Sequence, residues 1–140
     1  MSTLANVSTQ NQSNAALATA LLRVTMGGLF VAHAALKIFV FTLPGTVGYF
    51  ESIGLPGFLA YLTIAAELAG GLALIVGFRT RLVALALVPV LLGAAYFGHG
   101  ASGFFFSNPN GGWEFPAFWA IVLIAQSLLG AGAYSLDDRA

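Results

Sequence analysis

Four apolar stretches, each close to the length needed to cross a lipid bilayer, constrain this chain more than any other feature. They cover about residues 16–42, 57–77, 82–98 and 115–134, with turn signals between them. A membrane-spanning helix needs roughly 20 mostly apolar residues, because each residue adds about 1.5 Å along the axis. Hydrophobic residues make up 59% of the chain and charged residues only 7%. The sequence therefore predicts an all-α integral membrane protein, folded as an antiparallel four-helix bundle in a lipid bilayer.

The two ends of the chain are more polar than these stretches. Residues 1–14 are rich in Ser, Asn and Gln and contain no basic residue, so they do not resemble a cleaved signal peptide. We expect a disordered tail there, because so little apolar surface cannot offset the entropy lost on ordering. Residues 15–136 are expected to form one membrane domain, followed by a short tail at 137–140.

Charge and cysteine content exclude several classes of function. Five basic and five acidic residues give no net charge, so the chain lacks the basic surface that nucleic acid would require. It contains no cysteine, which excludes disulfides, thiol nucleophiles and thiolate metal sites. Its two histidines are not spaced as paired metal ligands on one helix, and we predict no metal site.

Basic residues predict the orientation in the membrane. Arg79 and Arg81 lie in the short connection between the second and third stretches. Basic residues close to membrane spans favour the cytoplasmic side. If all four stretches cross the bilayer, this connection shares a side with both chain ends. We therefore expect both termini in the cytoplasm.

Ionisable residues inside the apolar stretches mark a candidate site. Arg23, His33 and Lys37 fall within an arc of roughly 80° on one helix face, since a helix turns about 100° per residue. A charge near the bilayer centre costs at least about 2.5 to 3.5 kcal/mol, so this face should point into the bundle. Glu67 lies near the middle of the second stretch, at a depth where either Arg23 or His33 could pair with it.

The outer half of the bundle is expected to gather a polar pocket. Histidine can donate or accept protons there, and lysine or arginine can stabilise an anion or a carbonyl. The candidate catalytic residues are His33, Lys37, Glu67, His99 and Glu114. Aromatic side chains could wall a quinone ring, and the candidate cofactor-binding residues are Arg23, Trp113 and Trp119.

Each candidate also has a structural interpretation. Glu67 could form an ion pair that fixes helix register, and Arg23 and Lys37 could extend towards the membrane surface. His33 could hydrogen-bond across helices, while His99 and Glu114 could cap helices at the interface. The aromatic residues could be lipid-facing anchors.

Several motifs resemble the DoxX family of small bacterial membrane proteins. They include RVTMGGLFVAHAALK at 23–37, ELAGGLALIVGFRTRLVAL at 67–85 and GGWEFP at 111–116, and the likeness covers about residues 20–138. The resemblance implies a four-helix protein of the bacterial inner (plasma) membrane. It also implies an oxidoreductase component, because a similar archaeal protein and a small partner form a thiosulfate:quinone oxidoreductase. The likeness assigns no catalytic role to any residue here.

Three functions fit these observations. The first is an oxidoreductase component that uses quinone and receives its electrons from a substrate or a redox partner subunit. The second is a noncatalytic scaffold or partner subunit in a larger complex. The third is a transporter for a small solute, which would require a homo-oligomer with a path between its subunits.

Overall fold

The computed structural model describes residues 2–139, and helices make up all regular secondary structure within that range. The main helices are α1 (Ser2–Ala35), α2 (Leu43–Ser52), α3 (Phe58–Val76), α4 (Thr80–Gly93) and α5 (Glu114–Leu129). One-turn π-helical segments, η1 (Leu36–Val40) and η2 (Ala94–Gly98), continue α1 and α4. Short 3₁₀ turns, η3 (Gly100–Ser102) and η4 (Asp137–Arg139), complete the list. The predicted all-α class is confirmed.

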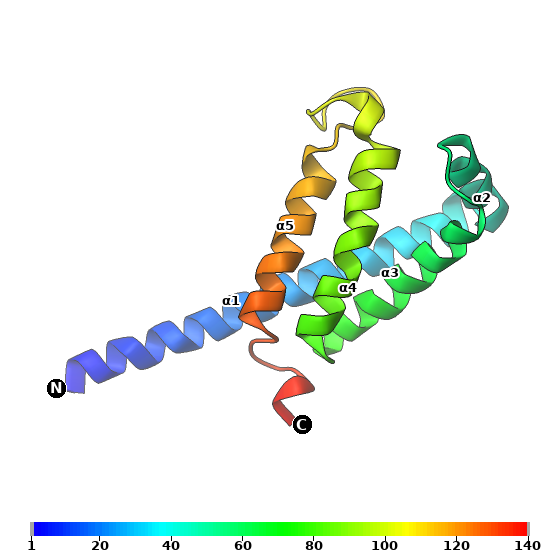
Figure 1. The fold of residues 1–140 in the computed structure, drawn as a ribbon. Helices are drawn as coiled ribbons and strands as arrows, with labels where there is room; N and C mark the ends of the chain where they lie inside the picture. The colour runs from blue at the N-terminus through cyan, green and yellow to red at the C-terminus, as the bar shows by residue number, and fades with distance from the viewer. Residues whose placement is uncertain (1, 140) are drawn as a thin grey trace.

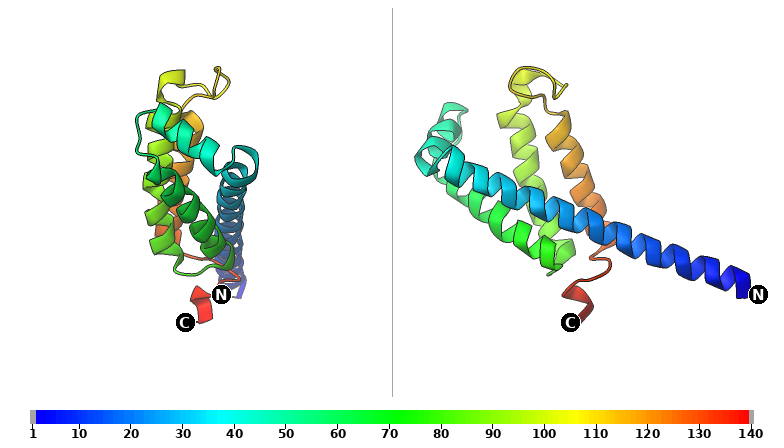
Figure 2. Two further views of the ribbon diagram at one scale, coloured as in Figure 1. Left: turned by 90° about the vertical axis from the view of Figure 1, so that its right-hand side faces the viewer. Right: turned by 180° about the vertical axis from the view of Figure 1, so that it is seen from behind.

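The long helices form two antiparallel pairs that cross at a steep angle. Helices α1 and α3 make one pair, α4 and α5 the other, and the pairs diverge towards α2 and the loop at residues 99–113 (Figure 1). We call these two regions the upper end, and the 77–80 turn together with residues 130–139 the lower end. Views from the side and from behind confirm that the pairs meet near the lower end (Figure 2).

The hydrophobic core lies where the two pairs cross. All four long helices contribute to it: the buried residues are Met26, Phe30, Leu74, Ala84, Leu87, Leu91, Trp119, Ala120 and Leu123. Most other large apolar side chains of the helices are exposed, as is expected for a surface that faces lipid rather than water.

Three helical segments have the length and apolar character to cross a membrane, Thr9–Val40, Phe58–Val76 and Thr80–Gly98. The chain is therefore a membrane protein with a helical bundle. Helix α5 is apolar but has only 16 residues, fewer than the roughly 20 of a typical span. That α5 forms a fourth span stays a prediction.

Glycines bring α1 and α3 into close backbone contact. A Cβ atom at Gly27 would lie 2.6 Å from the Gly71 carbonyl oxygen, and one at Gly71 would lie 2.8 Å from the Gly27 oxygen. Small residues allow such approach in lipid, where dispersion contacts drive helix association. The neighbouring Gly28 takes no part, because a Cβ atom there would meet nothing within 4 Å.

The structure differs from the sequence prediction in the N-terminal segment. Residues 2–14 continue α1 instead of forming a disordered tail, and they project away from the other helices (Figure 1). Extending an existing helix avoids the costly nucleation step, so a polar segment can follow an apolar one. The amide of Gln10 also donates a 3.1 Å hydrogen bond to Asn14, one turn further on.

Candidate functional site

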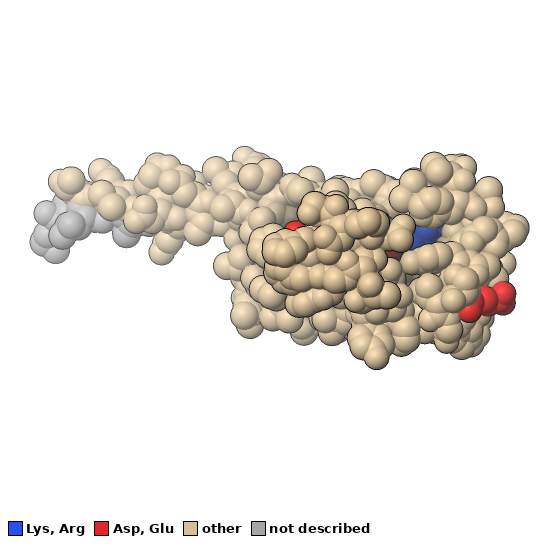
Figure 3. Space-filling view, turned by 90° about the horizontal axis from the view of Figure 1, so that it is seen from above, with Lys and Arg blue, Asp and Glu red and all other residues tan. Residues whose placement is uncertain are grey.

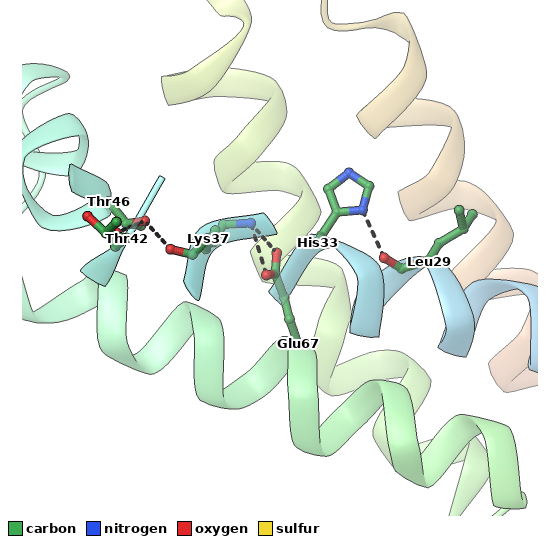
Figure 4. A network of polar contacts seen from close by, with 6 residues as sticks. All are labelled: Leu29, His33, Lys37, Thr42, Thr46 and Glu67. Carbon is green, nitrogen blue, oxygen red and sulfur yellow. Dashed lines mark hydrogen bonds and ion pairs between the residues drawn. The ribbon is translucent and has the colours of Figure 1, made fainter. Parts of the chain in front are cut away.

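A buried ion pair joins the end of α1 to the middle of α3. The Nζ atom of Lys37 lies 3.0 Å from Oε1 and 2.9 Å from Oε2 of Glu67 (Figure 4). The Lys37 side chain is 17% exposed and the Glu67 side chain 6%. The prediction that Arg23 or His33 pairs with Glu67 is therefore wrong. Glu67 faces the upper part of α1, where the Lys37 ammonium reaches it, whereas the Arg23 guanidinium is bound to backbone carbonyls of the segment after α5.

The local backbone around Lys37 is irregular. Lys37 lies in η1, and π turns of this kind occur frequently at functional sites. The buried hydroxyl of Thr46 lies 3.0 Å from the Lys37 carbonyl oxygen and 2.9 Å from that of Thr42 (Figure 4). Thr42 has φ 66° and ψ 161°, a conformation that costs about 1–3 kcal/mol in a β-branched residue. This strained link turns the chain from α1 into α2 and holds Lys37 in place.

His33 lies one helical turn before Lys37, with its ring on the side of α4 and α5 (Figure 4). Its Nδ1 atom is 2.8 Å from the Leu29 carbonyl oxygen, which can only accept, so Nδ1 carries the hydrogen. In the neutral ring, Nε2 is then left as an acceptor.

Trp119 from α5 closes this region on the side of the second helix pair. Its ring meets His33 edge-on with centroids 5.2 Å apart, and it also contacts Phe30 at 4.6 Å. The side chain is 5% exposed, and its Nε1 atom has no hydrogen-bond partner among the described residues. A buried indole N–H usually finds a partner, so this free donor beside His33 is a notable feature of the site.

His99 and Glu114 hold the upper loop together and do not join this group. The Nδ1 atom of His99 lies 2.9 Å from the Gly111 carbonyl oxygen. The Glu114 carboxylate accepts a 2.9 Å hydrogen bond from the backbone N–H of Phe106. Trp113 packs against Phe104 with ring centroids 4.8 Å apart and is 39% exposed. These contacts favour the structural interpretation of His99, Trp113 and Glu114.

Arg23 lies at the lower end and is 1% exposed. Its guanidinium donates to three backbone carbonyls of the segment after α5: Ala131 at 2.5 Å, Ala133 at 3.3 Å and Tyr134 at 2.9 Å. The face that Arg23 shares with Lys37 does point into the protein, as predicted. However, the two side chains lie in opposite halves of the protein. Arg23 is at the lower end and Lys37 towards the upper end, because α1 crosses the pair α4 and α5 between these two residues.

Seen from above, the upper end carries little charge. Basic atoms are visible in a hollow between the α2 region and the upper loop (Figure 3). The hydroxyl of Tyr49 in α2 reaches the carbonyl oxygen of Gly98 in η2 at 3.5 Å, which links the two diverging helix pairs. The contact of Tyr49 with Gly98 was not predicted from the sequence, since nothing in the local pattern around Tyr49 indicates a contact with a residue 49 positions away.

Comparison with known proteins places the chain in a family. The profile described as DoxX matches residues 18–100, which is more than half of the sequence. The chain belongs to the DoxX family. No solved structure matches it.

Three similar proteins have been named, and one of the names refers to an activity. This DoxX chain is 41% identical over 78 residues to "Putative oxidoreductase CatD" of Bacillus subtilis (strain 168), a match that covers 56% of the chain and 57% of that relative. It is 35% identical over 120 residues to "Inner membrane protein YqjF" of Escherichia coli (strain K12), which covers 82% and 85% of the two chains. A Haemophilus influenzae relative, named "Uncharacterized protein", is 31% identical over 122 residues.

The arrangement in this DoxX protein suits binding and proton exchange. Lys37 supplies a cation, Glu67 a carboxylate, and His33 a ring whose Nε2 can take up a proton. No group of three or more His, Asp or Glu residues suited to a metal ion occurs among the described residues. The site therefore offers charged and hydrogen-bonding groups beside aromatic rings, which is a pattern suited to a polar headgroup on a flat ring.

Proposed function

We propose that this DoxX protein is a component of a membrane oxidoreductase, with a quinone site formed by His33, Lys37 and Glu67. The observation that carries the proposal is the doubly hydrogen-bonded Lys37–Glu67 pair, with His33 one turn away. Ionisable residues inside a membrane are costly and are usually retained for function. The name of the Bacillus subtilis relative, an oxidoreductase, agrees with this class.

The residues of the site fit the needs of a quinone headgroup. A quinone takes up two electrons and two protons when it becomes a quinol, so negative charge develops on its carbonyl oxygens. Lys37 would donate a hydrogen bond to one such oxygen. His33 would take up a proton from water at Nε2 and pass it to the quinone, and would then be protonated again to supply the second proton. Glu67 would hold Lys37 in place. The two electrons would come from a reduced partner subunit, which oxidises its own substrate.

The proposed location is the bacterial inner (plasma) membrane with both termini in the cytoplasm. The basic residues Arg79 and Arg81 at the lower end support this orientation, because positive charges near spans favour the cytoplasm. The name of the Escherichia coli relative, an inner membrane protein, supports the location. The upper end with its hollow would then face outward.

Fluorescence of Trp119 tests the quinone site directly. The chain has two tryptophans, so Trp113→Phe leaves Trp119, whose ring contacts His33, as the only reporter. In lipid vesicles, which add no tryptophan of their own, a short-chain quinone should quench this fluorescence in a saturable way. The added changes Lys37→Gln and Glu67→Gln together remove both charges without leaving one unpaired. We expect saturable quenching to disappear in that variant while the helical circular dichroism stays unchanged.

A matched pair of histidine variants supplies the control. His33→Gln should weaken quinone quenching, whereas His99→Gln should not, because the His99 ring hydrogen-bonds to loop carbonyls away from the Lys37–Glu67 pair. Equal, unsaturable quenching in all variants would mean that quinone merely dissolves in the lipid, and the proposal would fail.

A noncatalytic scaffold is the second candidate. It is favoured by one observation: the Lys37–Glu67 pair satisfies both groups and ties the π turn to α3, which is what a structural pair would do. In that case the double Gln variant should lower the melting temperature, and the unmodified protein should bind no quinone. The same experiments therefore separate the two functions.

A further inference from the structure

A second charged hollow, of about 690 Å³, lies at the lower end, far from the Lys37–Glu67 pair. It is bordered by the start of α4, the end of α5 and the C-terminal segment. Its charged lining residues are Arg79, Arg81, Asp137 and Asp138. We propose that this hollow binds the headgroup of a phospholipid that carries a primary amine, of the ethanolamine type.

The two arginines have no carboxylate partner among the described residues. The Nη1 atom of Arg81 donates to the carbonyl oxygens of Ser127 at 2.9 Å and Leu128 at 2.6 Å. Its remaining N–H groups form no hydrogen bond within the described chain. The Arg79 guanidinium lies 5.8 Å from the centre of the Phe78 ring, its own neighbour. Two guanidinium groups with free donors at a membrane surface match a lipid phosphate.

The carboxylates of the two aspartates differ in how many hydrogen bonds they accept within the protein. The Asp137 carboxylate accepts hydrogen bonds from the backbone N–H groups of Arg79 at 2.6 Å and Thr80 at 2.9 Å. The positive charge of buried Arg23 also acts on it. Asp138 is exposed, and although the charge of Arg23 also acts on it, its carboxylate forms no hydrogen bond with a described side chain. The hollow thus offers free cationic donors and one exposed carboxylate that can still accept hydrogen bonds.

This charge pattern favours a zwitterionic headgroup over a purely anionic one. A phosphate would lie at Arg79 and Arg81, and a primary ammonium would donate hydrogen bonds to Asp138. A trimethylated amine has no N–H to donate, and a purely anionic headgroup would leave Asp138 unpaired beside it. Two leucines at the rim, Leu82 at 60% and Leu129 at 54% exposure, give the acyl chains an apolar path into the bilayer.

Native mass spectrometry of the delipidated protein tests this proposal. The three lipids compared have the same acyl chains, and their phosphate carries ethanolamine, choline or glycerol. We expect the ethanolamine lipid to bind about tenfold more tightly than the choline lipid, since one charge-assisted hydrogen bond separates them. The glycerol lipid should also bind more weakly than the ethanolamine lipid. Asp138→Ala, which removes the acceptor oxygens, should abolish the preference for ethanolamine over choline. Arg79→Gln should weaken the binding of all three lipids to a similar degree.

The control is Glu51→Gln, which removes an exposed carboxylate at the upper end and should leave all three affinities unchanged. Equal binding of ethanolamine and choline lipids to the unmodified protein would overturn the proposal. So would tighter binding of the glycerol lipid, or an ethanolamine preference that survives Asp138→Ala. These results do not depend on quinone binding, because the two sites share no residue.

Discussion

At the scale of single residues, the ion pair between Lys37 and Glu67 depends on which parts of α1 and α3 lie side by side. Helical periodicity places Arg23, His33 and Lys37 on one side, and the structure turns that side inward. The partner of Glu67 depends on which part of α1 lies beside the middle of α3. That alignment is set by the Gly27–Gly71 contact and by a π turn, and neither follows from spacing alone.

Asp137 is a residue whose role only the structure reveals. It lies far along the chain from α4, yet its carboxylate caps the first backbone N–H groups of that helix. Burial raises the pKa of Asp137, but the hydrogen bonds from Thr80 and Arg79 and the charge of Arg23 outweigh this, so its pKa lies below the usual value. The sequence places Asp137 in a short tail, whereas this contact ties the tail to the protein.

The capping contact predicts a pH dependence of stability. A lowered pKa in the folded state means that Asp137 stabilises the fold fully above its unfolded pKa of about 3.9, and that this contribution is lost as the pH falls through the lower folded value. Asp137→Asn should cost about 0.5–2 kcal/mol at neutral pH, as for the loss of a helix cap. Thermal unfolding in detergent from pH 7 to pH 3 measures both effects.

Asp138→Asn is the matched control for this series, because Asp138 caps no helix. The unmodified protein and the Asp138 variant should lose stability together as the medium becomes acidic, while the Asp137 variant should lose less. If the Asp137 variant follows the same pH curve as the other two, the carboxylate does not stabilise α4.

At the scale of helices, composition predicts the class and the approximate bounds of the elements. Apolar length locates α1, α3, α4 and α5 well, since this signal is strong in membrane proteins. It does not locate the N-terminal limit of α1, because a polar segment can continue a helix that the apolar residues have already nucleated.

The two neighbouring glycines of α1 give a sharp test of helix packing. Gly27→Ala places a methyl group 2.6 Å from the Gly71 carbonyl oxygen, so α1 and α3 must separate; overpacking of this kind costs about 1–3 kcal/mol. Gly28→Ala adds the same methyl group where nothing lies within 4 Å, and it should be neutral or slightly stabilising. The measurement is the melting temperature of each variant in the same detergent. Equal melting temperatures would contradict the close contact.

At the scale of the whole molecule, the sequence predicts one polar site in the outer half of a compact bundle. The structure instead separates the polar groups into the Lys37–Glu67 pair, the upper loop and the lower end. Crossing angles between helices cause this separation, since two antiparallel pairs that diverge cannot bring all their ends together (Figure 2). Such angles depend on the side chains at each contact and are not encoded in apolar length.

The number of membrane crossings is the remaining prediction at this scale. The chain has no cysteine, so single cysteines introduced at exposed positions report their side of the membrane without background. If α5 crosses as a fourth span, Ser107→Cys should react with an impermeant maleimide in intact spheroplasts. Ser13→Cys and Leu136→Cys should react only after the membrane is permeabilised. Labelling of Ser107→Cys and Leu136→Cys from the same side would show that the 16-residue α5 does not cross.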